Sequence, residues 1–425
     1  MITPYFVIIP LSAAFLIALI ARKKENIAAG IALIAGLALT VLSIYSFVLL
    51  SKSDGAIYYH FSNWKAPITI SLVLDYLSSF ILIIISVISL LAIFYSFQYL
   101  NHYTGKWQFF ALFMLMLTGM NGVALTGDFF NLFVFIEISL FAAYSLVAFG
   151  CEAEELEASF KYAIVGAISS TMILFSVGIL YSFTSSLNMA DVGRVLLNEK
   201  SKILYLVYGM LIMGLGLKSA LVPFHAWLPD AHPAAPAPIS SMLSGVLIKV
   251  LGIYAMIRIF FNVFNAPQIF LQIMLVLGTL SMVVGGLMSL KQWDIKRLLG
   301  FSTVSQVGYI FLGIGLGTPL GILGAIFYLL SHSIFKALLF MNAGAVEYAL
   351  DTRDMRKMGG LSKILPVTSS TSMIGSLAIS GIPPFNGFFA KLIIIIACIQ
   401  AGHPVYAGWA ILVSVITLAY YLKMQ

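Results

Sequence analysis

Thirteen apolar stretches follow one another through almost the whole chain. A membrane-spanning α-helix needs about 20 consecutive, mostly apolar residues. In lipid every backbone polar group must be paired, and a segment of this length achieves that as a helix. The sequence therefore predicts an all-α integral membrane protein of about 13 helices, at residues 2–21, 26–50, 71–97, 108–126, 129–149, 159–183, 203–222 with a continuation, 238–261, 268–290, 297–317, 319–348, 363–400 with a break, and 404–423.

Composition excludes a water-facing domain of ordinary size. Charged residues make up 9% of the 425 residues and apolar residues 61%, whereas soluble proteins carry about 25% charged residues. The net charge of +7 comes from Lys and Arg scattered through short loops and spans. This scatter indicates charges that orient the protein in the bilayer, so we expect no nucleic-acid partner.

Metal and cofactor sites are not expected either. Cys151 and Cys398 are the only cysteines, and neither lies in a CxxC motif or a Cys/His cluster. Zinc and iron–sulfur sites need about four such ligands. We therefore expect no cofactor, no metal and no redox or hydrolytic catalysis within this chain.

The basic residues between the spans divide unequally between alternate loops, with 13 on one side and 6 on the other. Cytoplasmic loops carry the excess of Lys and Arg. We expect a multi-pass protein of the cell membrane or an inner membrane, with the N-terminus outside and the C-terminus in the cytoplasm. The larger set is Arg22, Lys23, Lys24, Lys106, Lys161, Lys291, Lys296, Arg297, Arg353, Arg356, Lys357, Lys363 and Lys423, and the smaller is Lys52, Lys65, Arg194, Lys200, Lys202 and Arg258.

Four lysines and one acid lie deep within the predicted spans. An ionisable side chain at the bilayer centre costs about 2.5–3.5 kcal/mol on insertion scales, so its default interpretation is functional. Burial disfavours an ammonium group and a nearby carboxylate favours it, so a Lys whose acid partner moves can act as a proton switch. The lysines are Lys218, Lys249, Lys336 and Lys391, and the acid is Glu137.

Two simpler interpretations stay open for these residues. Glu137 and Lys218 could form a fixed ion pair that holds two helices together. Lys336 follows His332 by one helical turn, so the two lie on the same helical face. The simpler interpretation is that Lys336 lies toward a helix end and extends its charge to the membrane interface.

Proline interrupts two of the predicted spans, in SALVPFHAWLPDAHPAAPAP and in SGIPPFNGFFAK. Proline removes a backbone donor, and unpaired backbone groups at membrane depth persist only where they are buried in protein or line a wet cavity. Both breaks are therefore expected to border water paths. Each contains a Pro-Phe pair close to a buried Lys, which indicates a transporter built from two related halves.

Small polar residues form stripes on several spans. Close helix packing explains most such stripes, but the one that ends on a buried lysine is expected to be hydrated. That stripe is Ser241, Gly245 and Lys249, and the other two are Ser372, Ser376 and Ser380, and the cluster Ser302, Thr303, Ser305 and Gln306.

Five segments resemble, in the same order, those of the antiporter-like membrane subunits shared by respiratory complex I, the Mrp cation/proton antiporters and membrane-bound hydrogenase-type complexes. The resemblance runs from about residue 70 to the end of the chain. The segments are TGDFFNLFVFIEISL, GLKSALVPFHAWLPDAHPAAPAPISSMLSGVLIKV, LKQWDIKRLLGFSTVSQVGYI, SHSIFKALLF and SGIPPFNGFFAK.

The resemblance implies a fold of two inverted five-helix repeats, each with one discontinuous helix. It places three N-terminal helices in residues 1–107, the first repeat in 108–261 and the second in 262–425. Family members usually have a fourteenth span, which this sequence lacks, so a contact with a neighbouring subunit is in doubt.

The resemblance also implies an order of proton transfer. Glu137 and Lys218 match the family's paired acid and lysine, Lys249 and His332 the connecting residues, and Lys391 the residue near the exit. A lysine at 391 resembles the Mrp D-type and hydrogenase-like branch more than some complex I subunits, which carry Glu there. Further candidates are His225, Lys336 and Asp128.

Together these features predict a proton-translocating subunit of a multisubunit membrane complex. Its expected partners are other membrane-arm subunits, including further antiporter-like subunits and small Mrp-type or complex I-type subunits. The alternatives are a structural subunit that no longer pumps, Na⁺/H⁺ exchange as the main activity, and a free-standing secondary transporter.

Overall fold

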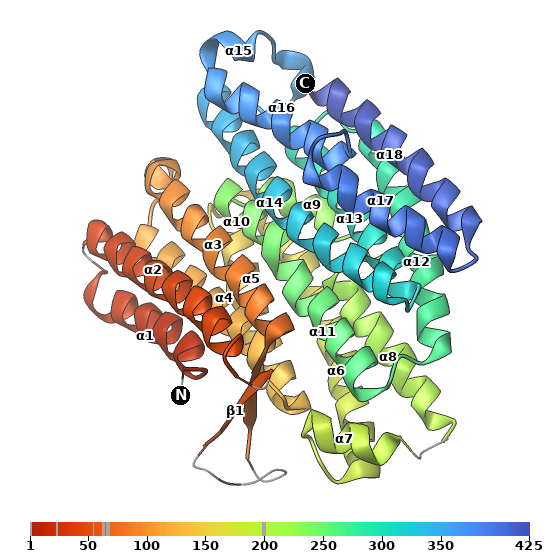
Figure 1. The fold of residues 1–425 in the computed structure, drawn as a ribbon. Coiled ribbons are helices and arrows are strands. Elements are labelled where there is room, and N and C mark those ends of the chain that lie inside the picture. Colours follow the sequence, from red (N-terminus) through yellow and green to blue (C-terminus); the bar gives the residue numbers. More distant parts are fainter. Residues whose placement is uncertain (1, 23, 54, 62–63, 65–68, 198–200) are drawn as a thin grey trace. The chain divides into compact units, whose positions relative to one another are not determined.

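The computed structural model describes residues 2–22, 24–53, 55–61, 64, 69–197 and 201–425. Its internal contacts divide the chain into two compact units, Met1–Lys218 with Val250–Asn265 (unit 1) and Ser219–Lys249 with Ala266–Gln425 (unit 2). Helices make up nearly all of both units (Figure 1).

Unit 1 contains α1 (Tyr5–Ile20), α2 (Glu25–Leu50), β1 (Ala56–His60), β2 (Ser71–Asp75), α3 (Tyr76–Tyr99), η2 (Leu100–His102), α4 (Lys106–Leu125), α5 (Phe129–Val147), α6 (Ala153–Thr184), α7 (Met189–Leu196), α8 (Ile203–Lys218), α11 (Ala255–Ile257) and the π-helical η5 (Arg258–Val263). Unit 2 contains α9 (Leu228–Ala234), α10 (Ala237–Met242), the π-helical η3 (Leu243–Leu247), α12 (Gln268–Leu290), α13 (Ile295–Gly315), α14 (Pro319–Leu350), η6 (Met355–Lys357), α15 (Leu361–Ile364), α16 (Pro366–Ser380), α17 (Asn386–Gln400) and α18 (Pro404–Met424). The π-helical η4 (Lys249–Tyr254) begins on the last residue of a unit 2 segment and continues into unit 1.

The helices have the length and apolarity of membrane spans. Within the described residues, ten helices are long and apolar enough to cross a bilayer, and three shorter apolar helices, α1, α8 and α17, accompany them. The chain is therefore a multi-pass, helical membrane protein, as predicted. The count of thirteen spans stays a prediction.

One predicted span begins later than the apolar pattern suggested. Residues 71–75 form strand β2 rather than helix, and β2 pairs antiparallel with β1 from Ala56↔Asp75 to His60↔Ser71 (Figure 1). The helix starts only at Tyr76, because the Asp75 carboxylate accepts a hydrogen bond from the Ser78 amide at 2.9 Å and caps α3. Hydropathy alone could not separate a short apolar strand from the helix that follows it.

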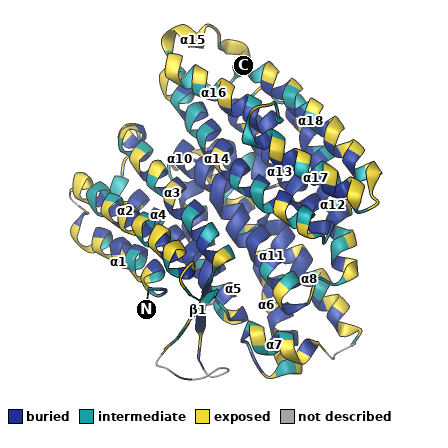
Figure 2. Cartoon of the chain, in the orientation of Figure 1, coloured by how far each residue is buried: buried dark blue, intermediate teal, exposed yellow. Residues whose placement is uncertain are grey.

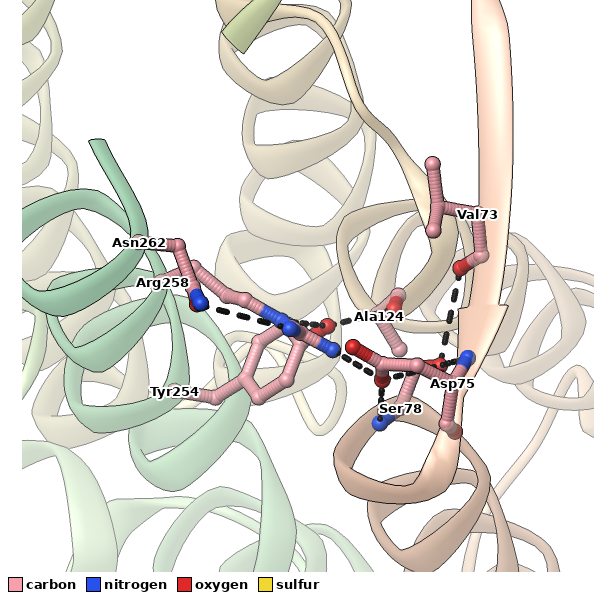
Figure 3. Close-up of polar contacts among 7 residues, drawn as sticks. All are labelled: Val73, Asp75, Ser78, Ala124, Tyr254, Arg258 and Asn262. Carbon is pink, nitrogen blue, oxygen red and sulfur yellow. Dashed lines mark hydrogen bonds and ion pairs between the residues drawn. The ribbon is translucent and has the colours of Figure 1, made fainter. Parts of the chain in front are cut away.

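Asp75 also anchors a polar network inside unit 1 (Figure 3). Its carboxylate pairs with Arg258 of η5, whose Nε donates to the Tyr254 hydroxyl at 2.9 Å. Tyr254 in turn donates to the backbone oxygen of Ala124 at 2.6 Å, at the end of α4. The network ties strand β2, α4 and the η4–η5 segment together. Arg258, which was counted among the charges that set the orientation, lies within the predicted span 238–261, and in the structure it is a helical residue paired with the partly buried Asp75.

Helix α13 lies in the interior of unit 2 (Figure 2). All of its residues except Arg297 are buried, although its composition is only moderately apolar. It packs tightly against α12 through glycine: a Cβ added to Gly285 would lie 2.5 Å from the Ser305 amide nitrogen, and one added to Gly308 would lie 2.5 Å from the Gly278 oxygen. This close approach is the packing role expected of small residues in membrane helices.

Both predicted helix breaks are present. Helix α8 ends at Lys218 and helix structure resumes with α9 at Leu228, and α16 ends at Ser380 before α17 begins at Asn386. A cis peptide bond precedes the proline of each Pro-Phe pair, at Pro223 and at Pro384.

Three basic residues used to predict orientation, Lys23, Lys65 and Lys200, lie outside the described residues. Another, Lys296, is buried in the first turn of α13 instead of lying in a loop, because it pairs with a carboxylate there. The predicted orientation and the repeat boundaries at 108–261 and 262–425 stay predictions.

Candidate functional site

Lys218 is the last residue of α8 and is 4% exposed. Its ammonium nitrogen donates to the Gly166 carbonyl oxygen at 3.0 Å and to the Ser170 hydroxyl at 2.9 Å. Both partners belong to α6, which packs on α8. The lysine thus ends its own helix beside a polar stretch of its neighbour.

Ser170 connects Lys218 to the partly buried acid Glu137. Its hydroxyl donates a short hydrogen bond to Glu137 Oε1 on α5. Within the described residues Glu137 and Lys218 form no direct ion pair, so the fixed pair considered from the sequence is replaced by a three-residue bridge. Ser170 can accept from the amine and donate to the carboxylate at the same time, because a hydroxyl has both capacities.

The bridge borders a cavity of ≈ 560 Å³ between α5 and α6, lined by Phe133, Glu137, Ser170 and Phe175 among others. Phe175 is 61% exposed, so the cavity reaches the surface of unit 1. The Glu137–Ser170 contact is therefore accessible from one side, while Lys218 lies behind it.

Glycine at position 166 makes this packing feasible. A Cβ there would overlap the Tyr144 hydroxyl oxygen. The absence of a side chain lets Tyr144 of α5 approach α6 at the turn whose carbonyl receives Lys218.

In unit 2, Lys249 is 1% exposed and bonds to its own helix. Its nitrogen donates to the carbonyl oxygens of Ser244 and, at 3.0 Å, of Gly245. Ser244 is linked by its hydroxyl to Thr303 of α13 at 2.7 Å, and a Cβ at Gly245 would lie 3.2 Å from the Ser333 oxygen on α14. Gly245 of the predicted stripe thus serves helix packing, and the hydration of Lys249 stays a prediction.

His332 and Lys391 both lie near Tyr328 in unit 2. The fully buried His332 ring stacks on Tyr328 with centroids 6.2 Å apart, and both ring nitrogens have no hydrogen-bond partner among the described residues. Lys391 Nζ lies 5.7 Å from the Tyr328 ring centroid and 4.6 Å from that of Tyr309. Lys391 also donates to the Ser380 oxygen at 3.4 Å, which links α17 to the end of α16.

Lys336 is fully buried and belongs to the same unit. Its nitrogen donates to the Leu299 oxygen of α13 at 2.7 Å and lies 3.3 Å from the Tyr421 hydroxyl of α18. The interpretation that its charge extends to the interface is therefore wrong, because the side chain ends in the interior of unit 2.

The two remaining candidates differ in their surroundings. Asp128 is the N-cap of α5 and accepts from the Asn131 amide at 2.8 Å, and burial raises the pKa of its carboxyl group. This is a structural role. His225 lies in the first break, and its Nδ1 is buried without a hydrogen-bond partner in the described part of the chain.

Sequence reasoning missed three polar groups. Ser170 was one serine among many, and only the fold shows that it bridges. His232 of α9 is fully buried, with its ring 4.9 Å from that of Phe340. Lys296 is 2% exposed and pairs with Glu347 of α14 at 2.6 Å. The position of Lys296 at the start of an apolar segment could have indicated a buried lysine. Its partner Glu347 could not be identified, because it is far away in sequence.

No group of three or more His, Cys, Asp or Glu side chains that could hold a metal ion occurs among the described residues. The candidate residues of the two units carry amines, hydroxyls, imidazoles and a carboxylate, which are groups that can take up and release protons.

Residues 126–417 match the protein family described as NADH:quinone oxidoreductase/Mrp antiporter, transmembrane. Residues 62–110 match the family described as NADH-ubiquinone oxidoreductase (complex I), chain 5 N-terminus. The first match covers well over half of the sequence and includes every candidate residue.

Individual relatives agree with this family. The chain is 34% identical to the D-type subunit of the Na⁺/H⁺ antiporter of Alkalihalophilus pseudofirmus, over 98% of this chain and 85% of the relative. It is 35% identical to the N-type subunit of the NADH-quinone oxidoreductase of Desulforudis audaxviator, over 98% and 84%. A chain of the membrane-bound sulfane sulfur reductase, an archaeal respiratory membrane complex, has the same fold with a TM-score of 0.94 and 32% identity, over 99% of this chain and 87% of that one.

Proposed function

Because the chain belongs to the NADH:quinone oxidoreductase/Mrp antiporter family of membrane subunits, we propose that it translocates protons as one subunit of a multisubunit membrane complex. Its energy would come from redox chemistry in other subunits or from a counter-ion gradient. The relatives named above are themselves subunits of a Na⁺/H⁺ antiporter, of a quinone oxidoreductase and of a respiratory membrane complex.

The Glu137–Ser170–Lys218 bridge is the observation that carries the proposal. The buried amine of Lys218 and the partly buried carboxylate of Glu137 share the Ser170 hydroxyl, so a small rotation of Ser170 changes how strongly the acid favours the ammonium. When the bridge is closed, Lys218 keeps its proton; when it opens, desolvation drives the proton onward. The cavity beside Glu137 supplies access from one side.

The proposed route continues through Lys249 and His332 to Lys391, with Lys336 as a further acceptor. Each of these side chains is buried, and His332 has two ring nitrogens without a bond among the described residues. Such nitrogens can take up and release protons, since neutral imidazole has one donor and one acceptor. When ionisable groups interact this closely, a measured apparent pKa describes the whole set of groups and cannot be assigned to a single residue.

The excess of basic residues on one side supports an N-terminus outside and a C-terminus in the cytoplasm. The partners we propose are further antiporter-like subunits and small subunits of the Mrp or complex I type. We propose that no cofactor is bound within this chain.

The test uses the native assembly reconstituted in vesicles, with proton movement followed by a pH-sensitive dye. Lys218→Ala and Glu137→Gln should reduce coupled translocation by tenfold or more, because the switch loses one partner. Matched controls are Lys161→Ala and Glu157→Gln, which break an exposed ion pair of 2.8 Å on α6. Both controls should pump normally.

The alternatives give different results. Near-normal pumping by both Lys218→Ala and Glu137→Gln would support a structural subunit and overturn the proposal. Proton movement that requires Na⁺, together with Na⁺ uptake into the vesicles that persists with a protonophore, would indicate Na⁺/H⁺ exchange instead. The subunits that copurify with the wild-type chain identify its complex.

A further inference from the structure

Helices α2 and α3 of unit 1 are in close contact along part of their length and separate toward one end. In the contacting part, Ser43 and Ser86 are hydrogen-bonded to each other at 2.8 Å. The helices still touch at Gly36, where an added Cβ would lie 3.1 Å from Cδ1 of Ile93. At Gly30, less than two turns nearer the start of α2, an added Cβ would have no described neighbour within 4 Å. Gly36 therefore serves packing, whereas Gly30 faces open space.

This open space belongs to a cavity of ≈ 340 Å³ lined by residues of α2, α3, η2 and α4. Its volume lies in the range of about 300–1,000 Å³ that is usual for small-molecule sites. Three candidate membrane helices reach the same surface of unit 1 here, since Glu25–Leu50 and Lys106–Leu125 begin and Tyr76–His102 ends beside the cavity. The cavity therefore lies at the edge of the membrane-spanning region.

The lining of the cavity changes from charged to apolar with depth. At the outer end Lys106 pairs with Glu25 at 3.4 Å and donates to Asn101 Oδ1 at 3.1 Å. Leu33 and Phe97 line the inner end, and Leu33 follows Glu25 by about 12 Å along α2. In a bilayer, the headgroup region passes into hydrocarbon over about 5–8 Å on each side. The cavity thus has the polarity profile of a phospholipid lying along the helices.

The surroundings of the cavity place it against the bilayer. Trp107 follows Lys106, and the Arg22 guanidinium lies 5.5 Å from the centre of its ring. Tryptophan and arginine are typical of the interface between lipid and water. Next to the apolar end, Ile34 of α2 and Phe94 of α3 are large, exposed apolar side chains. A lipid molecule can therefore enter the cavity sideways from the membrane.

We propose that this cavity is a binding site for phosphatidylethanolamine, a zwitterionic phospholipid with a primary amine. The Lys106 ammonium binds the lipid phosphate, and the Glu25 carboxylate binds the lipid ammonium, so that the ion pair of the protein faces the opposite charges of the headgroup. An ammonium group has three donors, so Lys106 can bind the phosphate and keep its bond to Asn101. The beginning of one acyl chain lies against Leu33 and Phe97.

The carboxylate of Glu25 decides the class of lipid. Phosphatidylglycerol has a phosphate but no cation, so its headgroup would bring a second negative charge beside Glu25. Phosphatidylcholine has a cation without an N–H group. Only the primary amine adds charge-assisted hydrogen bonds to the carboxylate, and these are about twice as strong as neutral ones.

The test uses the native assembly in phosphatidylcholine nanodiscs that contain phosphatidylethanolamine with a diazirine on its acyl chain. After irradiation, mass spectrometry should find cross-links at Leu33, Phe97 or Phe110, the apolar residues that line the cavity. Unlabelled phosphatidylethanolamine should suppress these cross-links at a mole fraction about tenfold lower than phosphatidylglycerol does. Absence of cross-links at these residues, as expected if another subunit fills the cavity, would overturn the inference. Equal competition by phosphatidylglycerol would overturn it as well.

Two variants test the apolar and the charged end separately. Gly30→Leu places a side chain in the cavity and should lower cross-linking about tenfold. Its control is Gly209→Leu on α8, where an added Cβ also has no described neighbour within 4 Å. Glu25→Gln should remove the preference for phosphatidylethanolamine over phosphatidylglycerol, whereas Glu157→Gln, in the exposed pair on α6, should keep it.

The variants also define the results that contradict the site. Cross-linking of Gly30→Leu at the wild-type level would show that the lipid does not occupy the cavity. A preference that survives in Glu25→Gln would show that the carboxylate does not select the headgroup. Neither readout depends on proton translocation, so this inference and the proposed function can fail independently.

Discussion

The Ser170 hydroxyl lies 2.9 Å from Lys218 Nζ and donates its own proton to Glu137. The acid and the base of the candidate site thus communicate through a single rotatable group. A rotation about one side-chain bond is enough to disconnect them.

Ser170→Ala should therefore weaken translocation although neither charged residue changes. A hydrogen bond to a charged group is worth about 1.5–3 kcal/mol, so a loss of roughly tenfold or more in the coupled rate is expected. Ser176→Ala is a matched control on α6, because Ser176 is fully buried and bonds to the Met172 oxygen at 2.8 Å. Equal rates in the two variants would show that Glu137 and Lys218 do not need the bridge.

Gly166→Ala should destabilise unit 1. The new Cβ would overlap the Tyr144 hydroxyl oxygen, so α5 and α6 must separate. Overpacking of this kind costs about 1–3 kcal/mol, measured as a lower melting temperature of the purified assembly. Gly178→Ala on the same helix has nothing within 4 Å of the added carbon and should melt like the wild type. A Gly166→Ala protein as stable as Gly178→Ala would mean that Tyr144 is free to move aside.

The sequence was a good guide to the helices and to the buried lysines, because long apolar runs and intramembrane charges are both costly to place elsewhere. It was a poor guide to residues whose role depends on a distant partner. Ser170 becomes a bridge only because α5, α6 and α8 meet. Lys296 was assigned to a loop because the predicted span began at 297, and its partner Glu347 lies on another helix, far away in sequence. The strand at 71–75 was missed since an apolar strand continues directly into an apolar helix.

Asp75 should make the stability of unit 1 depend on pH. Burial raises the pKa of this carboxyl group, but the hydrogen bond and charge of Arg258, with two bonds from Ser78, outweigh burial and hold the pKa below its usual value. A carboxyl whose pKa is lowered by folding stabilises the protein above about pH 3.9, its unfolded value, and loses that contribution as the pH falls through the lower folded value.

Asp75→Asn should accordingly remove this stabilisation at neutral pH, by about 1–2 kcal/mol because the pair is partly exposed, and should flatten the acid end of the melting curve against pH. Asp191→Asn serves as the control, since Asp191 lies 3.7 Å from the largely exposed Arg194. If the melting temperature falls with decreasing pH in the same way in the wild type and in Asp75→Asn, groups other than Asp75 cause the pH dependence of stability.

Glu347 should be the most sensitive carboxylate of unit 2. Its Oε2 pairs with Lys296 at 2.6 Å and its Oε1 lies 3.8 Å from Arg353, and Lys296 is 2% exposed. Glu347→Gln leaves the buried ammonium of Lys296 without its ion-pair partner, which costs about 3–5 kcal/mol. The expected result is loss of the assembly or a strongly lowered melting temperature. Asp354→Asn, which breaks an exposed pair with Arg356 at 2.9 Å, should have no measurable effect.

A double variant separates the cost of the lone charge from the value of the pair. Removing both groups, in Lys296→Met with Glu347→Leu, leaves no unpaired charge, and apolar replacements of a buried pair are often neutral or stabilising. The double variant should therefore regain most of the stability that Glu347→Gln loses. If it melts as low as the single variant, the ion pair itself stabilises unit 2; if Glu347→Gln melts like the wild type, Lys296 is held by its bond of 3.2 Å to the Ala235 oxygen and does not need the acid.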